Sequence, residues 1–219
     1  MKKFLLFLFM IFISAGSIYA YEDIFVEERP PQVEQVTESQ VVNIPQVAFD
    51  WADLTKDERI ANANKYRDII FDDASKIYLS KEEFKTTFEK YKKDKEYKHH
   101  YMLTNNGVTE DEDAKYSPFY YKKNTLIIYA IQYRNDIHNS LYYTAYGKLF
   151  YVDITSENYP NYPYYSMQYD KKGNLKTAIY FISPDIQYMY NGEKEFQGVW
   201  YKSQMFDLDN KQVSTREGW

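Results

Sequence analysis

The chain of 219 residues contains no cysteine, which excludes several kinds of protein at once. A disulfide framework, a thiol nucleophile and a lipid anchor on an N-terminal cysteine all require this residue. Glycine is also scarce, with seven residues, so a glycine-rich phosphate-binding loop is not expected. The fold must therefore be held together by its hydrophobic core alone.

Positive charge is in the minority and histidine is rare. The chain has 27 basic and 32 acidic side chains, a formal net charge of −5. This balance argues against nucleic acid as a partner, because nucleic acids are bound through clustered lysine and arginine. The three histidines, His99, His100 and His138, lack any paired metal-ligand spacing. We therefore expect no cofactor and no metal site.

Short polar motifs give little support for catalysis. Asp136, His138 and Ser140 could supply an acid, a base and a nucleophile, but a turn between strands explains them more simply. The acidic run at residues 110–113 has the charge of a calcium loop without its spacing. A hydrolase with an unrecognised carboxylate pair stays an alternative, because sequence does not show which carboxylates meet in space. We lean toward a protein that is not an enzyme.

Long hydrophobic runs are absent after the first twenty residues. Two lysines near the start precede an apolar run from Phe4 to Ile13, and small residues lead to Ala20. This pattern is typical of a bacterial secretory signal peptide, and the apolar run is shorter than the roughly 20 residues of a spanning helix. We interpret residues 1–20 as a signal peptide. The protein is predicted to be exported, periplasmic or extracellular, with no transmembrane segment after cleavage.

Residues 21–50 are rich in proline, glutamine and glutamate and contain no glycine. This composition is typical of a disordered tether. As an alternative, the valines of this segment, together with Ile44, could add a strand to the sheet of a partner.

Two capping boxes mark helix starts in the next segment, residues 51–115. Thr55 with Glu58 predicts a helix near residues 55–71, and Ser80 with Glu83 predicts a second one near residues 80–97. Both helices are expected to be amphipathic. The lysine-rich end of the second, at residues 92–98, is interpreted as a solvated face.

Residues 116–219 predict an antiparallel β domain. Short runs rich in tyrosine and β-branched residues are separated by turns, of which those at Gly147, Gly173 and Gly192 are the clearest. The expected strands lie near residues 125–134, 140–146, 149–154, 163–169, 175–182, 186–190 and 197–206. The predicted fold class is α+β, with two N-terminal amphipathic helices followed by a tyrosine-rich antiparallel β-meander of stacked hairpins.

Two stretches of the C-terminal half carry a family pattern. Residues Tyr169–Leu175 read Tyr-Asp-Lys-Lys-Gly-Asn-Leu, and Asn191–Lys194, Asn-Gly-Glu-Lys, is followed by Gly-Val-Trp at residues 198–200. This region resembles MORN-type repeats in their bacterial variant, although the spacing between its glycines is longer than a compact unit has. The resemblance implies an elongated sheet that serves as a scaffold or interaction surface. It implies no catalytic residues and does not reach the helical segment.

Tyrosine is abundant, with 25 residues, most of them in the predicted β domain. Tyrosine rings stabilise sheets through cross-strand pairs, but they also stack on sugars and on partner side chains. Our candidates for contact with a partner or a glycan are Tyr162, Tyr164, Tyr165 and Trp200. The sequence thus predicts an exported bacterial envelope protein that acts as a non-catalytic interaction or scaffold module for another envelope protein. A module that binds cell-wall glycan is the first alternative.

Overall fold

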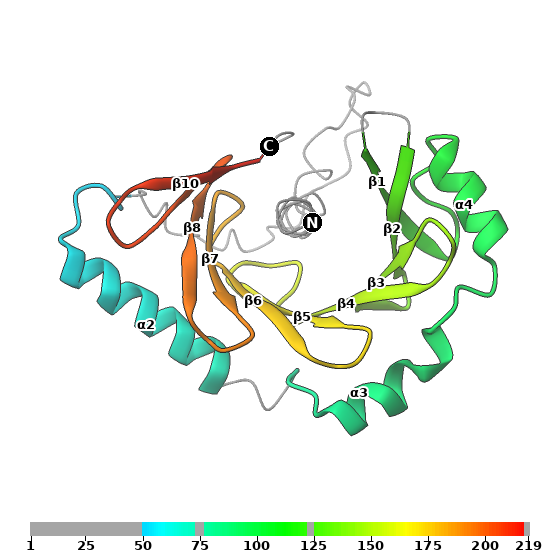
Figure 1. Ribbon diagram of the computed structural model, residues 1–219, viewed down its shortest axis with the longest axis horizontal. Helices are drawn as coiled ribbons and strands as arrows, with labels where there is room; N and C mark the ends of the chain where they lie inside the picture. The colour runs from blue at the N-terminus through cyan, green and yellow to red at the C-terminus, as the bar shows by residue number, and fades with distance from the viewer. Residues whose placement is uncertain (1–49, 73–76, 122–124, 217–219) are drawn as a thin grey trace, which may run out of the picture.

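The computed structural model describes residues 50–72, 77–121 and 125–216. The predicted signal peptide and nearly all of the predicted tether lie outside these ranges. Within them, three α-helices precede ten β-strands, which confirms the predicted α+β class with an antiparallel sheet after the helices (Figure 1). No helix in this part of the chain is long and apolar enough to cross a bilayer.

The helices are α2 (Lys56–Asp72), α3 (Lys81–Phe88) and α4 (Tyr97–Asn105), with a 3₁₀ turn, η3 (Glu89–Tyr91), after α3. Both predicted capping boxes are confirmed. The backbone N–H of Glu58 donates to Thr55 Oγ1 at 3.3 Å, and that of Thr55 donates to Glu58 Oε2 at 2.7 Å. At the start of α3, Ser80 and Glu83 make the same reciprocal pair.

The prediction of one helix over residues 80–97 is wrong in its extent. The chain leaves helical geometry after Tyr91 because Lys93 forms a β-bridge with Lys148, and the N–H of Asp94 donates to the carbonyl of Gly147. The carboxylate of Asp94 then accepts from the N–H of Glu96, just before α4 begins. Contacts with a distant hairpin thus break the local helical pattern, and α4 had no prediction of its own.

All ten strands form one antiparallel sheet in which each strand pairs with the next along the chain. The strands are β1 (Ala114–Tyr121), β2 (Thr125–Tyr133), β3 (Asp136–Thr144), β4 (Leu149–Thr155), β5 (Tyr164–Asp170), β6 (Leu175–Phe181), β7 (Ile186–Asn191), β8 (Phe196–Tyr201), β9 (Gln204–Phe206) and β10 (Gln212–Thr215). The predicted strand over residues 197–206 is two strands, because the chain reverses at Lys202, which has a φ of 53°. A positive φ of this kind is typical of tight hairpin turns.

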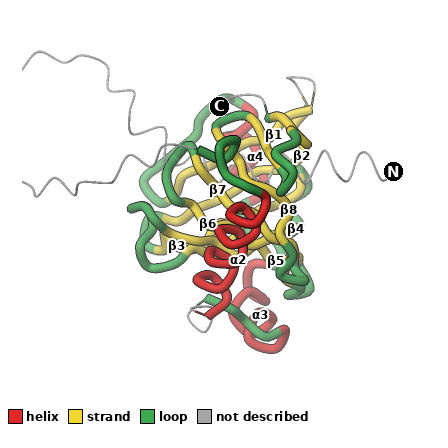
Figure 2. The backbone as a smooth tube through the Cα atoms, turned by 90° about the vertical axis from the view of Figure 1, so that its left-hand side faces the viewer, coloured by secondary structure: helices red, strands yellow, loops and turns green. Residues whose placement is uncertain are grey.

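The sheet curls into an arc, and the described helices all lie on its outer side (Figure 1). Seen from one side, α2 lies in front of the strands (Figure 2). We call the inner side the concave face. The main core lies between the helices and the outer side of the sheet, where Ile70, Phe84 and Phe88 pack among buried strand residues.

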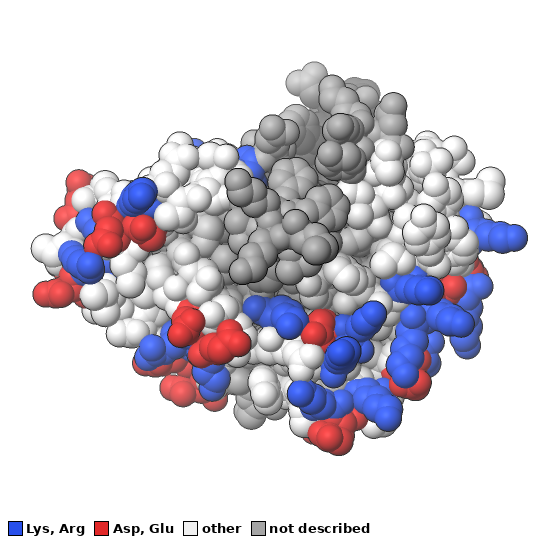
Figure 3. Space-filling model, in the orientation of Figure 1, with Lys and Arg blue, Asp and Glu red and all other residues white. Residues whose placement is uncertain are grey.

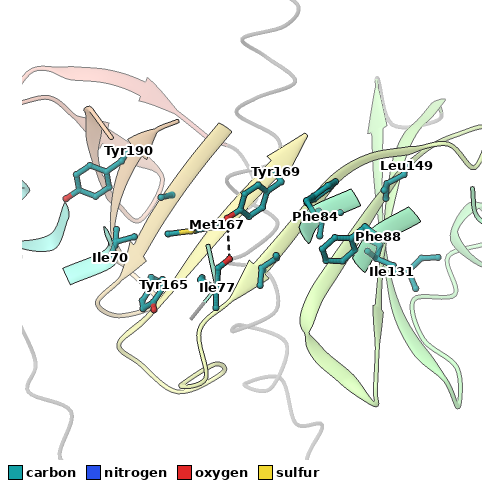
Figure 4. Close-up of a cluster of buried hydrophobic side chains, with 14 of the residues drawn as sticks. Ile70, Ile77, Phe84, Phe88, Ile131, Leu149, Tyr165, Met167, Tyr169 and Tyr190 are labelled. Atoms are coloured by element: carbon teal, nitrogen blue, oxygen red, sulfur yellow. Dashed lines mark hydrogen bonds between the residues drawn. The ribbon is translucent and has the colours of Figure 1, made fainter. Parts of the chain in front are cut away.

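Tyr169 of β5 shows how this core is joined (Figure 4). Its ring lies 5.6 Å from the ring of Phe84, measured between centroids. Its hydroxyl donates to the carbonyl of Ile77 at 3.2 Å and accepts from the N–H of Leu79 at 3.0 Å. A single buried tyrosine therefore connects the sheet to the segment that leads into α3.

Gly147, Gly173 and Gly192 lie in the turns β3–β4, β5–β6 and β7–β8. The first two have positive φ angles, 69° and 78°, and sit directly beneath α4 and α3. A Cβ on Gly147 would lie 2.8 Å from the Cβ of Tyr97, and one on Gly173 would lie 3.0 Å from the Cβ of Phe84. The hairpin turns are thus the surfaces on which these two helices pack.

Arg59 anchors the start of α2 to the far end of the sheet. Its guanidinium donates to the carbonyls of Trp51, Leu54 and Leu208 at 2.9, 2.7 and 2.9 Å. The indole N–H of Trp51 also donates to the carbonyl of Asp207 at 3.1 Å. These contacts hold the first described turn of the chain against the β9–β10 connection.

Candidate binding site on the concave face

A row of polar side chains crosses the concave face. Successive residues of a strand point to opposite sides of the sheet, so directly paired residues share a side. The cross-strand pairs continue from Gln132 to Ser140, then to Asp153, Gln168, Thr177 and Asn191. We call these six residues, which come from β2 to β7, the polar row.

Apolar side chains flank the polar row on the same face. On one side lies a buried cluster of Tyr164, Ile179, Phe181, Met189, Trp200 and Met205, against which Tyr159 and Tyr162 of the β4–β5 loop pack. On the other side lies a buried cluster of Phe119, Ile128, Ala130 and Tyr142. The concave face therefore has a polar band between two aromatic and aliphatic bands.

The polar row is buried except at Asn191, which is partly exposed. Burying polar side chains lowers stability unless hydrogen bonds compensate for the lost water. Gln132 is satisfied in part, since its amide donates to the carbonyl of Ile137 at 2.8 Å. Within the described ranges, however, Asp153 Oδ1 and Thr177 Oγ1 have no hydrogen-bond partner. The indole Nε1 of Trp200, on the same face, has none either.

Asp153 lies at a small cavity, which we call the Asp153 cavity. Its volume is about 10 Å³, counted as space open to the centre of a water molecule, which is room for about one such molecule. The lining residues are Gln132, Ser140, Tyr142, Asp153, Thr155, Tyr159, Tyr164, Ser166 and Phe181. Burial raises the pKa of Asp153 from 3.8 to about 6, and a hydrogen bond from Ser166 only partly opposes this. The carboxylate is thus poorly compensated inside the protein.

The fold brings three of the four predicted contact residues together. Tyr164 and Trp200 belong to one concave cluster and Tyr162 packs against it, whereas Tyr165 points to the other side, into the core beneath the helices. The expectation of open stacking rings is wrong for three of them, because Tyr164, Tyr165 and Trp200 are only 2%, 5% and 0% exposed. Trp200→Ala would therefore report on packing rather than on ligand contact. Of the four candidates, only Tyr162 is partly exposed, and we call it a rim residue of the concave face.

Asp153 is not among the residues predicted from the sequence. The available signal was a single acidic residue in the middle of an otherwise apolar and aromatic strand, Leu-Phe-Tyr-Val-Asp-Ile-Thr. Alternation along that strand places Asp153 on the same side as Tyr151 and Thr155. Only the pairing of β4 with β3 and β5 shows that this side continues into a polar row.

The histidine pair and the acidic run, which gave no metal site in the sequence, lie together at a second candidate site. This site is a cleft of about 520 Å³ beside η3 and α4. Its walls include His99, His100, three residues of the acidic run and lysines of the segment that follows α3. In the space-filling view, basic side chains gather over α3 and α4 with acidic ones among them (Figure 3). The walls therefore carry charges of both signs.

Structural contacts account for the buried charges of this cleft. His100 Nδ1 lies 2.8 Å from Asp94 Oδ2, and the hydroxyl of Tyr129 donates to the same oxygen at 2.7 Å. Burial acts to raise the pKa of Asp94, but the hydrogen bonds from His100 and Tyr129 outweigh it and hold the pKa below 3.8. In the described part of the chain, no group of three acidic or histidine side chains could hold a metal ion. The cluster fastens α4 to the sheet.

The Asp136, His138 and Ser140 motif does not form a relay. Asp136 accepts two hydrogen bonds from the amide of Asn139, both at 2.9 Å, and His138 Nδ1 lies 3.4 Å from the hydroxyl of Thr155. Ser140 belongs to the polar row and faces Gln132 and Asp153 instead. All three residues lie in strand β3, so the explanation by a turn between strands is wrong, and their contacts are those of a strand rather than of a catalytic relay.

No protein-family model, curated protein or solved structure is significantly similar to this chain. The resemblance of its C-terminal half to MORN-type repeats therefore stays a prediction.

Proposed function

We propose that the protein is an exported, non-catalytic binding module of the bacterial envelope, and that it holds a partner protein on its concave face. Two buried polar atoms carry the proposal: Asp153 Oδ1 and Thr177 Oγ1. Both lie on the face opposite the helices, and neither has a hydrogen-bond partner in the described part. Export rests on the signal-peptide pattern of residues 1–20.

Such atoms destabilise the folded protein. A buried polar atom without a partner costs about 1–3 kcal/mol, and folded proteins retain few of them. A polypeptide offers both donors and acceptors, so it can satisfy a carboxylate oxygen and a hydroxyl together. The flanking tyrosine and tryptophan side chains are also the types that protein interfaces favour. The face is therefore suited to receive a partner.

The polar row supports binding more than hydrolysis. It contains one carboxylate, Asp153, between serine and glutamine neighbours. Glycoside hydrolysis in its usual form needs two carboxyl groups about 5–10 Å apart. The hydroxyl and amide groups of the row are instead typical of hydrogen-bonding surfaces.

Site-specific photo-crosslinking in the producing cell tests the proposal. A benzoylphenylalanine in place of Tyr162 lies on the rim of the concave face, and the same substitution at Tyr146 is the control. Tyr146 is 80% exposed in the β3–β4 turn, away from this face. We expect a discrete adduct with an envelope protein from position 162 and none from position 146.

The captured protein must then be purified and must bind the wild-type chain directly. Binding should weaken at least tenfold in Asp153→Asn and should be unchanged in Asp68→Asn, a substitution on the outer helix α2. Equal adducts from both positions, or a purified candidate that binds both variants alike, would refute the proposal.

A cell-wall glycan is the second candidate, and the arrangement of the rim tyrosines favours it. The rings of Tyr159 and Tyr162 each lie 5.2 Å from that of Tyr164 between centroids, at interplanar angles of 82° and 41°. Aromatic surfaces of this kind can stack on sugar rings. Co-sedimentation with insoluble cell wall should then fall sharply in Tyr162→Ala but not in Tyr146→Ala. A wild-type protein that stays in the supernatant removes this candidate.

A further inference from the structure

The size of the Asp153 cavity limits what can enter it. The cavity has room for about one water-sized group. A lysine ammonium is a compact point charge of that size, whereas the arginine guanidinium is a larger planar fork. A cationic group that fits this space is therefore an ammonium.

The polar lining matches the hydrogen bonding of an ammonium. An ammonium has three donors and no acceptor, so it needs surrounding oxygen atoms. Asp153 Oδ1 has no hydrogen-bond partner in the described ranges, and it is the only acidic group among the lining residues. Ser140 and Thr155 add hydroxyl oxygens. Gln132 donates through its amide nitrogen to the carbonyl of Ile137, so the amide oxygen of Gln132 is the group that can accept a hydrogen bond.

Aromatic rings complete the lining. Tyr142, Tyr159, Tyr164 and Phe181 border the cavity. The rings of Tyr164 and Phe181 stack with centroids 4.5 Å apart, and the ring of Tyr159 stands edge-on to that of Tyr164. Ring faces attract cations, more strongly where water is excluded, and aromatic cages are a known way to hold ammonium groups. A carboxylate among aromatic lining residues selects for positive charge.

A buried water is the simpler occupant, but it compensates the charge of Asp153 less than a cation does. Water could hydrogen-bond to Asp153 Oδ1, yet it would leave the negative charge without an opposite charge. Burial already raises the pKa of Asp153 to about 6 despite the hydrogen bond from Ser166. A cation supplies the missing compensation.

The deep burial of the Asp153 carboxylate indicates which kind of molecule supplies the ammonium. Asp153 is 8% exposed and shares its cavity with Tyr159 of the β4–β5 loop. A lysine side chain carries its charge on a thin apolar stem of four carbons, which can lie along aromatic surface while the charge goes deeper. An amino sugar carries its nitrogen directly on a bulky ring and lacks this reach.

We infer that the concave face recognises a lysine side chain of the partner protein, with its ammonium bound in the Asp153 cavity. This inference rests on the proposed function, because it names the group by which that partner is held. The cavity thus provides an anchor for one residue of the partner, and the neighbouring aromatic bands contact the residues around it.

Three small amides test the inference on the purified full-length mature protein. The probes are the Nα-acetyl N-methylamides of lysine, norleucine and arginine, titrated by two-dimensional NMR at pH 7.5. The lysine amide should give saturable shifts at the backbone amides of β4 and β5, with a dissociation constant at least tenfold below that of the other two. In Asp153→Asn this preference should disappear, and in the charge-matched control Asp68→Asn it should remain.

The outcomes separate the inference from the proposed function. Equal, weak responses to lysine and norleucine would show that water alone occupies the cavity and would overturn the inference. Tight binding of the arginine amide would overturn the size argument and with it the assignment to lysine. If either occurs while the benzoylphenylalanine at position 162 still captures a specific partner whose binding weakens in Asp153→Asn, the proposed function stands without this anchor. If the crosslink fails too, both are refuted.

Discussion

Asp153→Asn should stabilise the free protein at neutral pH, although it removes the residue most important to the proposed binding. The folded protein raises the pKa of this carboxyl from 3.8 to about 6, mainly through burial. An acid whose pKa is raised on folding contributes most to stability below its unfolded pKa. That contribution is lost as the pH rises through the folded value.

The magnitude follows from the two pKa values. They differ by about two, and each unit corresponds to about 1.4 kcal/mol, so the ionised carboxylate costs about 3 kcal/mol at pH 7.5. Asparagine keeps the shape and can still accept from Ser166, but its own amide needs an acceptor in the cavity. We therefore expect a net gain of about 1–3 kcal/mol at pH 7.5. The gain should fade as the pH falls from about 6 toward 4, because the folded wild-type carboxyl is then protonated and no longer carries the buried charge.

Urea unfolding of the wild type and of Asp153→Asn, followed by tryptophan fluorescence at pH 4.0 and pH 7.5, measures the effect. Asp68→Asn, on the outer surface, serves as the control and should shift neither midpoint. An Asp153→Asn variant that is equally stable or less stable at pH 7.5 would refute the reasoning. So would a gain of the same size at both pH values, because it would not arise from ionisation. Stability lost to a functional charge is common in binding sites.

Three further predictions concern the scaffold. Gly192→Ala places a Cβ in a clash with the backbone carbonyl oxygen of Leu175, so it should lower the free energy of unfolding by about 1–3 kcal/mol in a urea titration. Arg59→Ala removes hydrogen bonds to three carbonyls, so it should cost about 2 kcal/mol or more and should speed hydrogen exchange in α2. Folding lowers the pKa of Asp94, so its stabilisation exists above about pH 4 and is lost as the pH falls through the folded value. Asp94→Asn should accordingly be less stable than the wild type at pH 7, and acid titrations should show this difference shrinking below pH 4.

Local signals in the sequence were reliable where the chemistry is local. The reciprocal hydrogen bonds at Ser80 and Glu83 start α3 where the capping box predicts, because all of their partners lie within one turn. The turns at Gly173 and Gly192 separate strands as expected, because they depend on a few residues. The end of the second helix was misplaced because the bridge from Lys93 to Lys148 is a contact between distant parts of the chain.

The sequence by itself determined the class of the protein: helices first, then an antiparallel sheet rich in tyrosine, without cysteine and with a pattern that predicts export. Only the tertiary structure decided which face each strand residue occupies and which face the helices cover. A register shift of one residue would turn every side chain of a strand to the other side, and register depends on pairing between strands. That pairing gathers Ser140, Asp153 and Gln168 into one row and turns Tyr165 away from Tyr164. The candidate site is therefore a property of the assembled sheet, which no single stretch of the sequence contains.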